Sequence, residues 1–445
     1  MSLHQLHYFF LLGLVAIIYQ FFPKHRKSWL LLVSLGVLFF YNLSSFFSII
    51  AVTWLTHWLA NKGSKTATII GVLINVGVFS LEKTLSIPGF SWQTDLQSAI
   101  WLLGMSFYVL QNIAYLIGTQ RMPFSDLLLL NGFFPKLFAG PILNQNQLVA
   151  WELKPIEFSQ VQKGIGQITF GLVKILVIAD RLTLAVSSVF DYMPNGSGLA
   201  VYTGVMLFFI QLYFNFSGYV NIAIGSTQIF GIQLPENFNF SLRSKNTISF
   251  WQRWHITLLK WLGDYIYYPL AYRFRSHQKA GMMMAVMATF LLSGLWSGFE
   301  MKYVLTVSWF GFVIIIERLT EKWRKGKVNP IIGWLVTFHV MAIGFLFFRS
   351  DDVAHGWQIL QSIFIDFWPQ DWLKDLIAPL ANGAHLNETF NWITSLLILI
   401  IALSFERKWQ TKAFAGSWYL VLIHLILILL LGDLNGGQNF IYMQF

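Results

Sequence analysis

Long apolar stretches separated by short polar segments make up most of this chain, a pattern typical of helices that cross a bilayer. A helix needs about 20 mostly apolar residues to cross the hydrocarbon core, and by that criterion the sequence predicts roughly 11 to 13 spans. We therefore expect an all-α integral membrane protein, with residues 1–445 forming a single multi-span domain. The predicted spans cover residues 6–22, 29–41, 45–60, 67–81, 99–118, 162–178, 199–221, 283–299, 303–318, 330–348, 391–405 and 416–432.

The composition supports the same class of protein. Hydrophobic residues make up 56% of the chain and charged residues only 11%, whereas a soluble domain carries about 25% charged residues. Such a chain cannot cover a water-facing surface, so we expect the lipid bilayer as its main partner. The net charge of +10 is spread over short connecting segments. That distribution favours cytoplasmic loops and anionic lipid, and we expect no nucleic acid partner.

The first apolar stretch predicts the orientation of the chain. It ends directly before the basic run Lys24-His25-Arg26-Lys27, and positive charge beside a span marks the cytoplasmic side. The stretch is too long and too aromatic for a signal-peptide core, and no small-residue cleavage site follows it. We therefore expect a retained first helix with its N-terminus outside the cytoplasm.

Two regions do not have the pattern of simple spans. Residues 133–142 are apolar but are interrupted by Pro135, Gly140 and Pro141. Broken backbone survives at membrane depth only where protein or water satisfies its polar groups, so we predict a re-entrant segment; an interfacial loop is the alternative. Residues 234–270 mix charged and aromatic side chains, which indicates short helices and loops lining a cavity on the cytoplasmic side.

Common catalytic motifs are missing from the sequence. The chain has no cysteine, which excludes disulfides and thiolate metal sites. It also lacks the His-Glu-x-x-His metal pair, the phosphate-binding glycine loop and the Gly-x-Ser-x-Gly elbow. We therefore expect no metal site and no resident cofactor, and protease, ATPase and soluble-type esterase functions are disfavoured.

A cluster of ionisable groups and tryptophans surrounds His255. Arg253 precedes it, Asp264 follows, and tryptophans flank it; ionisable groups are costly in a hydrophobic protein, so their clustering indicates a functional site. If the segment is helical, Trp251 and Leu259 share the face of His255. An imidazole in such apolar surroundings stays neutral and can act as a general base. The alternative is a structural histidine bonded to a carbonyl group.

A series of motifs, in a fixed order over about residues 100–360, resembles the membrane-bound O-acyltransferase family. The resemblance is to its bacterial branch of polysaccharide O-acetylases and teichoic acid D-alanyl-transfer proteins. The motifs are Gly104-Met105-Ser106-Phe107-Tyr108, Phe134-Pro135 with Ala139-Gly140-Pro141-Ile142, Tyr213-Phe214-Asn215-Phe216-Ser217-Gly218-Tyr219 with Leu234-Pro235-Glu236-Asn237-Phe238, Phe250 to Ile256 with Asp264 to Leu270, and Gly344 to Arg349.

This resemblance implies a fold and an activity. The family fold is a ring of tilted helices in which funnels from both membrane faces meet at a histidine in a central tunnel. The implied donor is an acyl thioester, acyl-CoA or acyl carrier protein, and the implied acceptor is a hydroxyl of an extracytoplasmic polysaccharide or cell-envelope polymer. The resemblance also implies a multi-pass protein of the bacterial cytoplasmic membrane, which works with an extracytoplasmic acyltransferase partner or a carrier protein.

The chain departs from the family pattern at several ionisable positions. The near-invariant histidine of the family falls on Ser297, and a second histidine falls on Phe310. Aspartates of the family fall on Asn215, Asn221 and Gly118. Because serine is a poor base, Ser297 cannot replace histidine directly.

Three classes of function remain open. In the first, the protein is an O-acyltransferase in which His255 is the surviving base, while Ser297 stabilises the oxyanion or holds the acyl group. In the second, it is a catalytically impaired homologue that serves as a scaffold or as an acyl-carrier docking partner in an envelope assembly; a lipid or polyol transporter on a similar helix ring is a third class. The predicted substrate-binding residues are Asn215, Ser217, Arg253, Trp254, Asp264 and Trp296.

Overall fold

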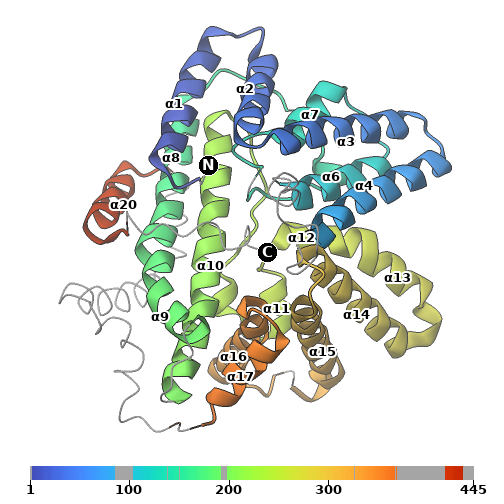
Figure 1. The fold of residues 1–445 in the computed structure, drawn as a ribbon, viewed down its shortest axis with the longest axis vertical. Coiled ribbons are helices and arrows are strands. Elements are labelled where there is room, and N and C mark those ends of the chain that lie inside the picture. The colour runs from blue at the N-terminus through green and yellow to red at the C-terminus, as the bar shows by residue number, and fades with distance from the viewer. Residues whose placement is uncertain are drawn as a thin grey trace. The chain divides into compact units, whose positions relative to one another are not determined.

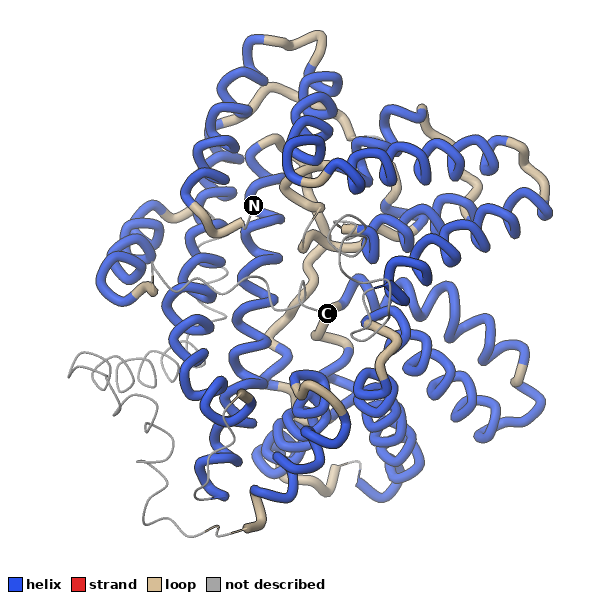
Figure 2. Tube along the Cα trace, in the orientation of Figure 1, coloured by secondary structure: helices blue, strands red, loops and turns tan. Residues whose placement is uncertain are grey.

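The computed structural model is built from helices and loops throughout the part of the chain that it describes (Figures 1 and 2). The described residues are 3–85, 104–137, 139–149, 151–191, 198–324, 326–365, 367 and 416–433. The chain folds as two compact units: residues 1–168, 219–236 and 413–418 form unit 1, and residues 169–218, 237–412 and 419–445 form unit 2.

Six helices are long and apolar enough to cross a membrane, and three shorter helices are also apolar. The prediction of an all-α membrane protein is therefore confirmed. The long ones are Leu43–Asn61, Lys65–Leu85, Gly198–Ile229, Arg275–Ser297, Met301–Arg324 and Pro330–Arg349, and the shorter ones are Leu6–Phe21, Met105–Ile117 and Trp418–Leu431. The predicted span 391–405 lies outside the described residues.

Unit 1 contains the N-terminal helices. Helix α3 packs against α4, α6 and α7, and α2 packs against α1, α3 and α7. Its helices are α1 (Leu6–Phe21), α2 (Arg26–Tyr41), α3 (Leu43–Asn61), α4 (Lys65–Leu85), α6 (Met105–Ile117), α7 (Phe124–Gly132), η1 (Gln145–Gln147) and most of α8 (Phe158–Leu172). The end of α10 (Gly198–Ile229) also belongs to unit 1 and meets α8 where Gly164 faces Gly225. A Cβ atom on either glycine would lie 2.6 Å from the carbonyl oxygen of the other, so this close approach requires glycine.

A continuous chain of amide side chains links the helices of unit 1. Asn112 donates to Asn75 at 3.1 Å, Asn131 donates to Asn112 at 2.7 Å, and Gln111 donates to Asn131 at 3.2 Å. The chain ends at Lys136, whose Nζ donates to Gln111 Oε1 at 2.8 Å. Buried polar groups of a membrane protein are thereby satisfied inside the protein, which ties α4, α6 and α7 to one another.

The interrupted segment 133–142 is irregular and lies inside unit 1. Its described residues form turns instead of a helix, and they are buried. Gly140 N donates to Lys136 O at 2.8 Å, and a Cβ atom on Gly140 would lie 2.2 Å from Lys136 Cγ. Protein thus surrounds the broken backbone, as a re-entrant segment requires; that the segment enters and leaves on the same membrane face stays a prediction.

Unit 2 is built around a helical hairpin. Helix α14 packs along α15, α15 packs against α16, and α11 packs against both α15 and α16. The helices of unit 2 are η2 (Val173–Ala179), α9 (Asp180–Phe190), the start of α10, η3 (Ser241–Arg243), α11 (Thr247–Trp251), α12 (Ile256–Leu262), η4 (Gly263–Tyr267), α13 (Tyr268–Arg273), η5 (Arg275–His277), α14 (Gln278–Ser297), α15 (Met301–Arg324), α16 (Pro330–Arg349), α17 (Val353–Ser362) and α20 (Trp418–Leu431).

Polar caps define where several of these helices begin. Asn246 accepts a hydrogen bond from Ser249 N at the start of α11, at 2.7 Å. Asn329 caps α16 directly before Pro330, and Asp352 caps α17. Short side-chain acceptors at this position satisfy backbone N–H groups that have no partner within the helix, and proline is well tolerated in the first turn.

Candidate functional site

The chain breaks its helix at His255. Helix α11 ends at Trp251, and α12 begins directly after His255, which has the left-handed backbone angles φ 44° and ψ 52°. The segment is therefore not one continuous helix, so the condition under which Trp251 and Leu259 would share a helical face with His255 is not met. A non-glycine residue in this conformation costs on the order of 1–3 kcal/mol and persists only where its surroundings hold it.

A second segment of chain supplies that support. Asn239 N donates to Arg253 O at 2.9 Å on one side of His255, and Ile256 N donates to Asn237 O at 2.9 Å on the other. The side chain of Asn237 also accepts two hydrogen bonds through Oδ1, from Thr257 N at 3.0 Å and from Thr257 Oγ1 at 2.8 Å. Residues 237–239 therefore fix the backbone of the histidine from outside its own helix.

The imidazole of His255 lies in an aromatic environment within unit 2. Its ring meets Phe216 of α10 edge to face, at a centroid distance of 5.0 Å, and Trp296 of α14 in the same manner, at 5.9 Å. Only 2% of His255 is exposed. Burial lowers the pKa of this imidazole to about 3, because the charged form loses its hydration. The side chain is thus a neutral imidazole at physiological pH.

Trp254, the residue directly before His255, packs in an aromatic cluster. It is buried and packs on Phe250 at 5.4 Å, on Phe238 at 5.2 Å and on Phe345 at 5.2 Å between ring centroids. Phe345 belongs to the late aromatic motif of α16, so the motif around residue 250 and the motif around residue 345 meet in one aromatic cluster. The sequence predicted Trp254 as a substrate-binding residue, and that role stays a prediction; in the structure its ring packs in this aromatic cluster.

The other predicted site residues divide into buried and exposed ones. Asn215 and Ser217 are buried on α10, on either side of the Phe216 that contacts His255. Arg253 is half-buried and lends its carbonyl group to the segment that holds His255. Asp264 is exposed, in the π-helical turn η4 after α12.

Ser297 is the last residue of α14 and is half-buried. Its Oγ donates to the carbonyl oxygen of Ser293 at 3.2 Å, one turn earlier in the same helix. The residue of this motif whose ring meets His255 is Trp296. The approach of Ser297 to His255 across a cavity stays a prediction.

Phe310 occupies the position where the resemblance places a second histidine. Its ring packs against Trp251 at 5.0 Å and against Phe345 at 5.0 Å, and the residue is 2% exposed. An apolar ring thus stands among aromatic side chains at the position where the resemblance places an ionisable group. This position of the chain has become part of the apolar core of unit 2.

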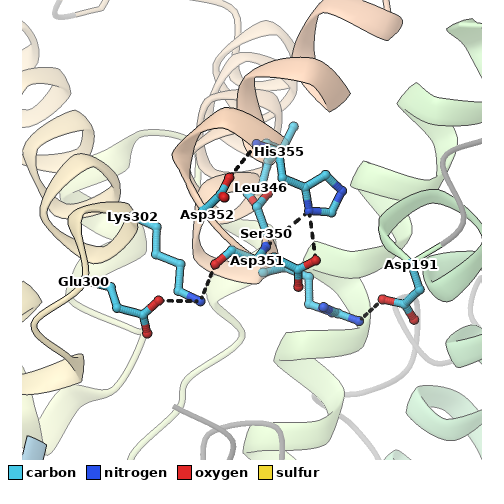
Figure 3. A network of polar contacts seen from close by, with 9 residues as sticks. Asp191, Glu300, Lys302, Leu346, Ser350, Asp351, Asp352 and His355 are labelled. Carbon is cyan, nitrogen blue, oxygen red and sulfur yellow. Dashed lines mark hydrogen bonds and ion pairs between the residues drawn. The ribbon is translucent and has the colours of Figure 1, made fainter. Parts of the chain in front are cut away.

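A network of charged groups lies at the end of unit 2 where α14 turns into α15 (Figure 3). Arg349, the last residue of the late aromatic motif, pairs with Asp191 at 2.7 Å. Lys302 pairs with Glu300 at 3.4 Å and donates to the carbonyl oxygen of Asp351 at 3.2 Å. These contacts join the end of α9, the start of α15 and the turn between α16 and α17, which gives Arg349 a structural role. Within the described residues, no group of three or more His, Asp or Glu side chains is arranged to hold a metal ion.

Comparison with known proteins decides the family. Residues 120–349, just over half of the chain, match the model of the MBOAT, membrane-bound O-acyltransferase family. The chain belongs to this family. The prediction made from the ordered motifs is confirmed, and with it the enzyme class: this membrane protein is an O-acyltransferase.

Several curated relatives are similar to this member of the family. A probable alginate O-acetylase of Pseudomonas aeruginosa is 28% identical in an alignment of 389 residues that covers 80% of this chain and 73% of the relative. A peptidoglycan O-acetyltransferase of Helicobacter pylori is 26% identical over 77% of this chain and 74% of its own length. A teichoic acid D-alanyltransferase of Bacillus subtilis is 26% identical over 58% of this chain and 70% of its own length.

Proposed function

We propose that this O-acyltransferase moves an acyl group from a cytoplasmic thioester to a hydroxyl of an extracytoplasmic polysaccharide or other envelope polymer. The observation that carries the proposal is the buried, neutral imidazole of His255, held in a left-handed conformation between α10 and α14. The names of the relatives, which act on alginate, peptidoglycan and teichoic acid, support this class of acceptor. We place the protein in a bacterial cytoplasmic membrane.

The proposed step uses His255 as a general base. The acceptor hydroxyl oxygen attacks the thioester carbonyl carbon while its proton passes to the imidazole. The tetrahedral intermediate collapses, the C–S bond breaks, and the sulfur leaves with the electron pair. The thiolate then takes the proton from the imidazolium, so the products are an ester and a thiol. Because the imidazolium is disfavoured in a dry site, it returns its proton readily to a thiolate, whose ordinary pKa is about 8.5.

The distribution of charge along unit 2 supports the proposed sidedness. Basic residues lie before α14, at Arg273 and Arg275, and at the end of α15, at Lys322 and Arg324. The turn that joins the two helices lies at the opposite end of this hairpin. The positive-inside rule then puts the basic ends in the cytoplasm and the turn outside.

The segment that leads to His255 runs between these two ends. Thr247 donates to Glu317, near the basic end of α15, and the ring of Trp251 packs on Phe310 about midway along. His255 then meets Trp296 beside the turn. We therefore propose that the donor, acyl-CoA or an acyl carrier protein, approaches from the basic end, and that the polymer or an extracytoplasmic partner approaches from the turn.

The absence of cysteine makes a direct test possible. Since the chain has no thiol of its own, any thiol that appears with purified protein in proteoliposomes comes from the donor. Acetyl-CoA is the donor probe, an oligomannuronate is the acceptor probe, and thiol release is followed with a chromogenic disulfide. We expect release that depends on the acceptor and yields an alkali-labile ester.

Two histidine variants sharpen this test. His255→Ala should lower the rate by about 10²–10⁴, the usual contribution of a general base. His277→Ala removes an exposed histidine in η5 and should leave the rate unchanged. If neither acetyl-CoA nor an acetylated carrier protein releases thiol with the unmodified chain, the proposed thioester donor is wrong.

A further inference from the structure

The side chain of Asn237 carries a buried hydrogen-bond donor without a partner in the described part of the chain. Asn237 is 1% exposed. Its Oδ1 faces Thr257 N and Thr257 Oγ1, and its Nδ2 has no hydrogen-bond partner there. A backbone N–H can only donate, so the amide atom that faces it must be the oxygen. The orientation of the carboxamide is therefore fixed, and Nδ2 is the atom that remains.

Such a donor needs an explanation. Most buried amide groups in folded proteins find a partner, and an unsatisfied one opposes folding. A side chain with only an acceptor oxygen would hold Thr257 equally well, because both contacts to Thr257 use Oδ1. The second half of the carboxamide is thus not required by the hydrogen bonds that hold His255.

The residue that carries this donor is bonded to the backbone next to the proposed base. Asn237 O binds Ile256 N, the peptide that directly follows His255. The next residue, Phe238, packs on Phe216 at 4.9 Å and on Trp254 at 5.2 Å, and Phe216 is the ring that meets His255. Asn237 and His255 therefore belong to one packed cluster of unit 2.

We propose that Asn237 Nδ2 donates a hydrogen bond to the carbonyl oxygen of the acyl thioester and stabilises the oxyanion that forms there. This inference deepens the proposed function and rests on it. When the acceptor oxygen bonds to the carbonyl carbon, the carbonyl π electrons move to its oxygen, and the hydroxyl proton goes to His255. Nδ2 keeps its own proton throughout, and the oxyanion returns its electrons when the C–S bond breaks.

Preorganisation is what makes such a donor effective. Two hydrogen bonds from Thr257 hold the carboxamide before substrate arrives, so no reorientation is needed as charge develops. Ser297 is the other candidate from the sequence, but its single hydroxyl proton is donated to Ser293 O. The amide therefore suits the role better than the serine does.

Asn237→Asp removes the proposed donor, Nδ2, and keeps an oxygen that accepts the hydrogen bonds from Thr257. The aspartate keeps an acceptor for Thr257 and nearly the same volume, but its ionised carboxylate cannot donate. At pH 8 we expect kcat for acetyl-CoA-dependent thiol release to fall by about 10²–10³, with KM little changed. As the pH is lowered to 5, kcat should recover partly, since a protonated carboxyl donates a hydrogen bond.

Thr257→Val is the matched control for the anchor. It removes one of the two hydrogen bonds that hold the carboxamide and keeps both the backbone contact and Nδ2, so kcat should fall by less than in the Asn237 variants, by no more than about tenfold. Asn237→Ser is made in parallel, for the case that the buried carboxylate prevents folding; its hydroxyl is too short to reach the position of Nδ2, so kcat should fall as well. Size-exclusion profiles establish that each variant is folded.

The outcomes separate this inference from the proposed function. If the unmodified protein releases no thiol, the proposed function itself fails. If the unmodified protein is active, three results each overturn the role of Asn237: unchanged kcat in the folded Asp or Ser variant, an equal loss in Thr257→Val, or a loss in the Asp variant that does not change with pH.

Discussion

The buried imidazole of His255 should make the protein sensitive to mild acid. Burial lowers the pKa of His255 from 6.5 to about 3 in the folded protein. Between these two values the unfolded chain binds a proton that the folded chain does not, so the stability is fully present above pH 6.5 and is lost as the pH falls through this window. His255 lies between α11 and α12, outside the spanning helices.

The size of the effect follows from linkage. Each pH unit below 6.5 lowers the free energy of unfolding by about 1.4 kcal/mol for one such group, until the pKa of the folded state is reached. At pH 5, which is about 1.5 units lower, His255 should therefore remove about 2 kcal/mol from the free energy of unfolding. That amount is a large part of the net stability of an ordinary fold, which is about 5–15 kcal/mol.

His255→Asn provides the reference for this measurement. Asparagine does not titrate, and it tolerates the left-handed backbone that position 255 requires. The free energy of unfolding is measured in detergent micelles at pH 8 and pH 5, for both proteins, by titration with a denaturing detergent. The unmodified protein should lose about 2 kcal/mol more than the variant, because all other titrating groups are common to both. Equal losses in the two proteins would refute the reasoning, since His255 would then be solvated or already charged.

Two further predictions concern Ser297 and Gly140. Ser297→Ala should change kcat for thiol release by less than about threefold, because the hydroxyl is bound to Ser293 O in its own helix; a loss of a hundredfold in steady-state assays would instead give it a catalytic role. Gly140→Ala should destabilise the protein by about 1–3 kcal/mol, since the new Cβ would lie 2.6 Å from the Lys136 carbonyl oxygen. Denaturation in detergent checks this, and an unchanged midpoint would show that the turn can open to accept the methyl group.

Much of the fold and the family was predictable because those signals are local. A span is encoded in the hydropathy of consecutive residues, and long apolar helices such as Pro330–Arg349 appear where the sequence predicts them. Proline and glycine interrupt helices wherever they occur, so the irregular segment 133–142 was also evident. The motifs around Asn215, His255 and Phe345 identified the family from their order alone.

The geometry of the site depended on contacts between distant parts of the chain. The helix break at His255 is held by residues 237–239, and no periodicity near position 255 encodes that contact. The motif around Leu234 included Asn237, but a side chain that anchors through one amide atom and leaves the other buried is visible only in three dimensions. Likewise, packing of α14 decided that Trp296 meets the imidazole. Hydrophobicity is a property of each residue and can be predicted from the sequence. Backbone strain and the pairing of hydrogen-bond donors and acceptors are properties of the folded chain.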